Sequence, residues 1–248
     1  MFTTSLFNTL IFIPFYNSLM VLTGFVGGSV GLSVVILTVL VKSAILPLSH
    51  KSIKTQSNLR KIDPEIRKIK EKHKNNQQDQ AKATMELYKM HGINPFSGCL
   101  LTLIQIPIIF GLYWVFWKGL LDIETNKAIL YSFVDIPTVM NFYFLGINLV
   151  EKNITVSILA GVSQFFLMKL SMPPIKIDDK KSNETQSFSD EFKKGLSTQA
   201  RYVLPVVIAV VSLNFHAVVP LYWLTSNLFS LGHELLVRRS AKKLLSQA

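Results

Sequence analysis

Cysteine is nearly absent from this chain of 248 residues, which contains only Cys99. A single cysteine excludes an intrachain disulfide framework and a cysteine-based metal cluster. The first residues lack the basic segment of a signal peptide and the arginines of an organellar transit peptide, so we expect mature sequence of a bacterial protein. Motifs such as HExxH, GxSxG and the P-loop are also absent. We therefore expect no enzymatic activity, no cofactor and no metal site.

Charged residues are scarce over long stretches, while hydrophobic residues make up 49% of the chain and mean hydropathy is +0.35. This composition is typical of a membrane protein. A bilayer core about 30 Å thick requires roughly 20 mostly apolar residues in a helix. The sequence therefore predicts an all-α polytopic membrane protein. Its five predicted transmembrane helices cover residues 29–48, 95–118, 153–171, 201–215 and 217–238.

The charges between these runs predict the orientation. Residues 49–94 hold eleven lysines and arginines against five acidic residues, so this segment should be cytoplasmic. The loop 119–152 leans acidic and should lie outside, whereas the loop 172–200, with the flanking Arg201, and the tail 239–248 should lie inside. We expect a protein of the bacterial cytoplasmic membrane with its N-terminus out and its C-terminus in. Because topology accounts for the net charge of +11, no DNA partner is expected.

Residues 1–28 form a separate unit in this interpretation. Residues 2–25 carry no charge and are long enough to cross a bilayer. Their polar side chains nevertheless gather mostly on one side of a helical projection, and Pro14 interrupts the run. This pattern favours a helix that lies in the outer interface. A sixth span remains the alternative, because the loops that follow would keep their sides in either case.

The segment 49–94 is predicted to form a helical hairpin. Asp63 before Pro64 is a helix start signal, and Asp79 can cap a second helix that ends at Gly92. The basic charge of the hairpin has two explanations: a solvated cytoplasmic face, or a docking site for the ribosome or for anionic lipid.

Lys42 is the one charged side chain between Met1 and Leu48, and it lies inside the first predicted span. It could reach the cytoplasmic interface by extending its side chain, or it could line a hydrated cavity. Stripes of small and polar residues on four predicted spans favour the cavity, although any single stripe could be a helix-packing surface. Beyond Lys42, the stripe residues that we select as candidates are Thr38, Gln105, Gln164, Tyr222, Ser226 and Asn227.

Five segments carry a resemblance to a known family. They are GLSVVILTVLVKSAILPLSHKS (31–52), LYKMHGINPFSGCLLTLIQIPIIFGLYW (87–114), ILAGVSQFFLMKLS (158–171), QARYVLPVVIAVV (199–211) and LYWLTSNLFSLGHELLVRR (221–239). In order and spacing they resemble the YidC/Oxa/Alb membrane protein insertases in their short bacterial form. The resemblance implies a five-span core, an interfacial helix before it, a cytoplasmic hairpin and a groove closed toward the outside. It assigns to that groove Lys42, Thr38, Gln105, Tyr222 and Trp223.

The sequence departs from the family pattern at three places. Lys42 stands where the family usually has arginine, and lysine lacks the planar fork of arginine. FHAV (215–218) replaces the usual FPxG turn, and the loop 171–201 is somewhat extended. These departures leave the resemblance of the five segments to the family in place.

The function that we expect is insertion of integral membrane proteins and assistance in their folding. The partners would be nascent membrane proteins, the ribosome and the phospholipid bilayer, with the Sec translocon as an optional further partner. Two alternatives stay open: a small-solute anion channel or transporter with Lys42 as its anion site, and a scaffold for the assembly of membrane complexes.

Overall fold

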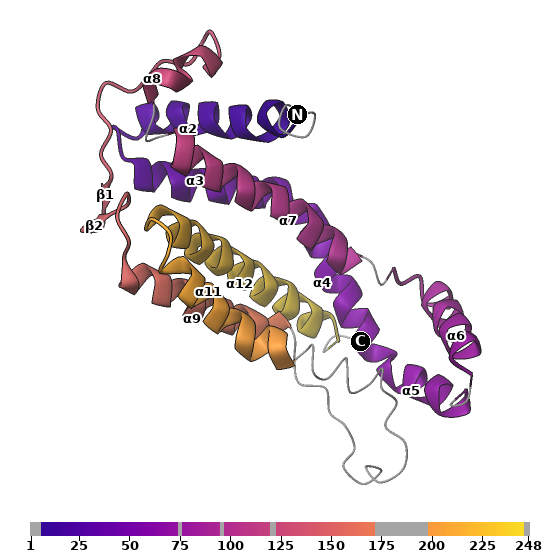
Figure 1. Cartoon of the computed structure of the whole chain (residues 1–248). Helices are drawn as coiled ribbons and strands as arrows, with labels where there is room; N and C mark the ends of the chain where they lie inside the picture. Colours follow the sequence, from indigo (N-terminus) through magenta and orange to yellow (C-terminus); the bar gives the residue numbers. More distant parts are fainter. Residues whose placement is uncertain (1–5, 74–75, 95–96, 120–122, 172–197, 246–248) are drawn as a thin grey trace.

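The computed structural model describes residues 6–73, 76–94, 97–119, 123–171 and 198–245, and these are mainly helical (Figure 1). The longer helices are α2 (Ile13–Phe25), α3 (Val30–Ala44), α4 (Leu46–Lys61), α5 (Asp63–Lys72), α6 (Gln77–Met90), α7 (Ser97–Trp114), α9 (Ile154–Ser171), α11 (Leu204–Ser212) and α12 (Val218–Leu245). Short π-helical turns, η1 (Asn8–Phe12), η2 (Val115–Gly119) and η5 (Gln199–Val203), adjoin α2, α7 and α11. The predicted fold class is confirmed.

The helices of the core run side by side, and α2 crosses one end of them (Figure 1). Helix α12 packs against both α9 and α3, and α11 packs against α9. By length and apolar composition, Asn8–Phe25 and Ile154–Ser171 could each cross a membrane, and α3 with α4 could form one bent span. Leu103–Trp117 and Gln199–Ser212 are apolar but shorter. The count of five spans therefore stays a prediction.

The first predicted span, residues 29–48, is not one straight helix. Helix α3 ends at Ala44, α4 begins at Leu46, and the two meet at an angle of 60°. Pro47 explains the break, because it has no N–H to donate to the preceding turn and its ring crowds that turn. Helix α4 then continues to Lys61, so the start of the predicted cytoplasmic segment 49–94 belongs to the helix that begins within the predicted span.

The predicted hairpin is present as α5 and α6, which pack against each other, but its helix ends differ from the prediction. Asp63 is the first residue of α5, not its cap, and its carboxylate accepts a hydrogen bond of 3.1 Å from Nε of Arg67. Asn76, not Asp79, caps α6, because its side chain accepts from the N–H groups of Gln78 and Asp79. Helix α6 ends at Met90.

The segment 119–152, predicted as an extracytoplasmic loop, contains short elements: α8 (Ile123–Asn126), the 3-10 turn η3 (Lys127–Ile129), and an antiparallel pair, β1 (Tyr143–Phe144) and β2 (Ile147–Asn148). Its last part joins the start of α12, where the N–H of Ala217 donates to the carbonyl of Glu151 at 2.7 Å. The last predicted span also runs further than expected, since α12 continues to Leu245 through most of the predicted tail 239–248.

Close packing of α9 against α11 depends on Gly161. A Cβ at this position would lie 2.6 Å from Cβ of Ala209 and 2.9 Å from the carbonyl oxygen of Pro205. Gly161→Ala should therefore lower the free energy of unfolding by about 1–3 kcal/mol, as overpacking does. Thermal unfolding in detergent measures this.

Gly24→Ala in α2 is the matched control, because nothing lies within 4 Å of its Cβ position. It should be neutral or stabilising by up to about 1 kcal/mol, since alanine favours a helix over glycine. Equal melting temperatures for the two variants would contradict the close approach at Gly161.

Candidate functional site

Lys42 lies in the last turn of α3, partly buried, and its ammonium group faces two other helices. Its Nζ donates to Oε1 of Gln105 on α7 at 3.2 Å and to Oγ of Ser230 on α12 at 3.4 Å. Nε2 of Gln105 in turn donates to the hydroxyl of Tyr222 on α12. One polar cluster, made of Lys42, Gln105, Tyr222 and Ser230, thus joins α3, α7 and α12.

The charge of Lys42 has no acidic partner within the part of the chain that the structure describes. The salt bridges there include those of Arg67 with Asp63, His91 with Glu65, and Arg238 with Glu234. The hydrogen-bond partners of Lys42 are neutral groups, and removing an ammonium group from water without a counter-charge costs free energy. The cluster therefore favours contact with water or with an anionic group from outside the chain.

Thr38 and Trp223 are close to cluster residues in the sequence but add no hydrogen bond to the cluster among the described contacts. Thr38 is fully buried one turn before Lys42, and its Oγ1 donates to the carbonyl of Val34 at 2.7 Å. Trp223 is partly buried against the core that contains Tyr222. Their role in a groove therefore stays a prediction.

Gln164 and Asn227 occupy a different place, the contact between α9 and α12. Nδ2 of Asn227 donates to Oγ of Ser163 at 3.0 Å and lies 3.5 Å from the carbonyl oxygen of Ala160. Gln164 is buried on α9 near the same contact. Here the polar stripe is a helix-packing surface, which was the alternative interpretation. Ser226 is buried as well, and its carbonyl accepts from Oγ of Ser230 at 2.8 Å.

Sequence reasoning did not select Ser230, although a signal was available. Ser230 follows Ser226 by four residues and so lies on the same side of α12.

A second polar group, the Glu234–Arg238 clamp, was also not selected. Glu234 is only 4% exposed and is paired with Arg238 at 2.8 Å. Nη2 of Arg238 donates to the carbonyl of Leu170 at 2.5 Å, and Ser171 donates to Glu234. The clamp ties the end of α9 to α12, and its signal in the sequence is the four-residue spacing of opposite charges.

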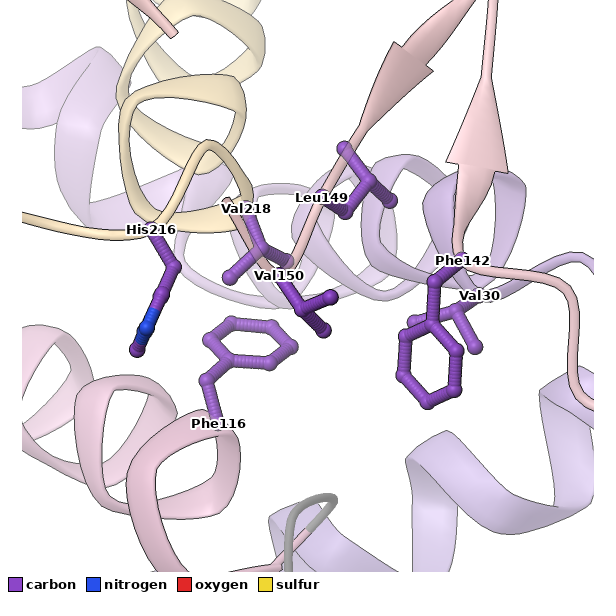
Figure 2. Close-up of a pocket in the computed structure, with 7 residues that line it drawn as sticks. All are labelled: Val30, Phe116, Phe142, Leu149, Val150, His216 and Val218. Carbon is purple, nitrogen blue, oxygen red and sulfur yellow. The ribbon is translucent and has the colours of Figure 1, made fainter. Parts of the chain in front are cut away.

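The end of the bundle opposite the polar cluster is filled by apolar side chains. Figure 2 shows a small hollow there, lined by Val30, Phe116, Phe142, Leu149, Val150 and Val218, with His216 as its one polar residue. Val30 precedes Lys42 by twelve residues, which is about 18 Å along a helix. This hollow is therefore separate from the Lys42 cluster.

Comparison with known proteins finds one family and relatives that share one name. A model of the family described as 60Kd inner membrane protein matches residues 21–244. A protein of Pelobacter propionicus named Membrane protein insertase YidC is 32% identical over 216 residues, which is 86% of this chain and 35% of that protein. The protein of the same name from Alcanivorax borkumensis is 31% identical over 218 residues, 87% of this chain and 32% of its own length.

A third relative, from Francisella tularensis subsp. novicida, has the same name and is 32% identical over 212 residues, 86% of this chain and 33% of its own. The chain thus spans about a third of the length of these curated relatives. The matched region includes α3, α7 and α12, and with them the polar cluster around Lys42. The chain is therefore a bacterial membrane protein and belongs to the 60Kd inner membrane protein family.

Proposed function

We propose that this chain is a membrane protein insertase that moves hydrophobic segments into the bilayer without a chemical step. The observation that carries the proposal is the position of Lys42, partly buried between α3, α7 and α12 with only neutral hydrogen-bond partners among the described residues. The names of the relatives support the same activity.

In this mechanism the polar or acidic flank of a client enters beside Lys42 from the cytoplasmic side. Water and positive charge partway across the membrane shorten the distance that the flank must travel through hydrocarbon, which lowers the barrier. The apolar part of the client slides into lipid along α7 and α12. Exposed apolar side chains on α7, namely Leu103, Ile106 and Phe110, support this route.

The proposed orientation places α5 and α6 in the cytoplasm, α2 in the outer interface, the N-terminus outside and the C-terminus inside. The crossing of α2 over one end of the bundle supports an interfacial position for this helix (Figure 1). The partners are nascent membrane proteins, the ribosome that makes them and the surrounding bilayer, with the Sec translocon as an optional partner.

The apolar side chains that line the hollow of Figure 2 at the proposed outer end argue against an anion channel, because a conducting path would need polar groups there. An assembly scaffold would use the same surfaces as an insertase but would bind finished subunits instead of growing chains. A scaffold would contact a client after its synthesis, whereas an insertase contacts it during synthesis.

Site-specific crosslinking to stalled ribosome–nascent chains tests the proposal. A photoreactive residue at Gln105 or Trp223 should capture a client during its synthesis. The same residue at Val206 should not, because Val206 is exposed on α11, whereas the cluster is built from α3, α7 and α12.

Capture at Val206 as strong as at Gln105, or capture of finished subunits alone, would contradict the insertase. Solute flux through the purified protein, without insertion of clients, would favour a channel.

A further inference from the structure

The loop between α7 and α9 exposes apolar side chains at the end of the bundle that α2 crosses. Residues 128–150 contain one charged side chain, Asp135. Six exposed residues of this loop and of the end of α2 form what we call the outer rim. They are Phe25 (83% exposed), Tyr131 (40%), Phe133 (76%), Val139 (64%), Tyr143 (62%) and Leu145 (85%).

The outer rim follows α2 because hydrogen bonds fix the loop to it at two places. Near the middle of α2, the buried Asn17 accepts from the N–H of Tyr131 at 2.7 Å and donates to the carbonyl of Ile129 at 3.0 Å. Just beyond the end of α2, Asn141 donates to the carbonyl of Gly28 at 2.8 Å and accepts from the N–H of Val30 at 3.1 Å. The loop and α2 therefore lie at the same level of the protein.

The tip of the β1–β2 hairpin carries an apolar residue at a conformational cost. The two turn residues, Leu145 and Gly146, have φ angles of +51° and +79°. A two-residue turn of this kind favours Asn-Gly, because glycine adopts positive φ freely and asparagine tolerates it, whereas most other residues are strained there. Leu145 accepts this strain although its side chain packs on almost nothing within the protein. An apolar partner outside the chain would offset that cost.

We propose that the outer rim enters the outer leaflet of the membrane at the boundary between headgroups and acyl chains, as a second anchor beside α2. This rests on the proposed orientation of α2 in the outer interface. Tyrosine is suited to that boundary, because its ring meets lipid while its hydroxyl meets water. Phenylalanine and leucine supply apolar side chains that enter the acyl region beside it. The exposed Leu6 and Leu10 (61% and 68%) extend the apolar surface toward the other end of α2. The low charge of the loop between α7 and α9 and its continuity with α2 favour contact of the outer rim with lipid over contact with a second protein.

A depth measurement with spin labels tests the outer rim. In a Cys99→Ser background, Leu145→Cys or Phe133→Cys gives a single label site, and Phe133 lies outside the strained turn. The labelled full chain is placed in vesicles of phosphatidylethanolamine and phosphatidylglycerol. The accessibility of each label to oxygen and to a water-soluble nickel chelate is then compared. Both labels should be several-fold more accessible to oxygen than to the nickel chelate, which corresponds to a depth of about 5–10 Å in the membrane.

Two control sites lie outside the outer rim. Lys152→Cys places a label at an exposed charged position of the same loop. Met90→Cys places a label at the end of α6, at an apolar residue that is 76% exposed but does not belong to the outer rim. Both labels should prefer the nickel chelate, as in water. Equal chelate accessibility at Leu145, Phe133 and Lys152 would overturn the proposal. Protection of the rim labels from both reagents would also overturn it, because a second protein copy would then cover the rim.

Labels at Leu10 and Phe25 check the orientation of α2 in the same vesicles. Equal depths support an interfacial α2, whereas a difference of about 20 Å, the length of the helix between them, would overturn the orientation on which the rim depends. No client or ribosome is present in this experiment, so a failure of the insertase proposal leaves its outcome unaffected.

Discussion

Replacing Lys42 with alanine is expected to lower the insertion of single-span clients with acidic outer tails by about tenfold. The reason is the loss of attraction between the ammonium group and the acidic flank beside it in the proposed mechanism. A loss of about 1.4 kcal/mol is a factor of ten, and a charge pair in a partly hydrated site is of this order. Insertion into proteoliposomes, measured as protease protection of the outer tail, gives the result. Clients with neutral tails should lose much less.

Three further variants at this position separate charge from hydrogen bonding. Lys42→Arg keeps the charge and should insert clients as well as the parent protein. Lys42→Gln keeps a donor for Gln105 and Ser230 without charge, and should resemble Lys42→Ala for acidic tails. Lys42→Glu should fail most clearly, because it repels the acidic flank. Full insertion of acidic-tailed clients by Lys42→Ala would refute the role of charge attraction.

Breaking the Glu234–Arg238 clamp should have the largest effect on stability. In Arg238→Ala the nearly buried carboxylate of Glu234 loses its counter-charge. Removal of one partner of a buried pair costs about 3–5 kcal/mol, and we expect about 2–4 kcal/mol here because the Arg238 side chain is 35% exposed. The contact of α12 with the end of α9 through Leu170 would be lost as well. Thermal unfolding in detergent measures the change.

The Asp63–Arg67 pair in α5 is a matched control for the clamp, since it has the same four-residue spacing but is 50% and 44% exposed. Arg67→Ala should change stability by less than about 0.5 kcal/mol. The double variant Glu234→Gln, Arg238→Met removes both charges and should recover most of the loss. An Arg238→Ala protein that melts like the parent would show that the clamp does not hold α9 and α12 together.

The residues that the structure brings to Lys42 were partly predictable. The sequence places Gln105 and Tyr222 on polar stripes, and the structure joins both to Lys42 through one chain of hydrogen bonds. It also places Asn227 on such a stripe, but this side chain points to Ser163 on α9. A stripe shows which residues share one side of a helix. It does not show whether that side faces a cavity or another helix, because this depends on which helices are neighbours.

Helix ends were less predictable than helix faces. Asp79 and Asn76 are both good capping residues, and the position of the turn between α5 and α6 selected Asn76. Pro47 in the predicted first span was a visible signal for a break. The direction of the bend and the angle of 60° between α3 and α4 depend instead on how α4 packs against α7 and α12.

The sequence by itself determined the membrane class, the helical character and the family resemblance, because hydrophobic length, charge distribution and motif spacing are properties of neighbouring residues. It also identified Lys42 as the unusual charge. Only the tertiary structure decided that Lys42 meets Gln105 and Ser230, that Glu234 and Arg238 join α9 to α12, and that the loop between α7 and α9 follows α2. These contacts join residues tens to nearly two hundred positions apart, and only the packing of whole helices determines which of them meet.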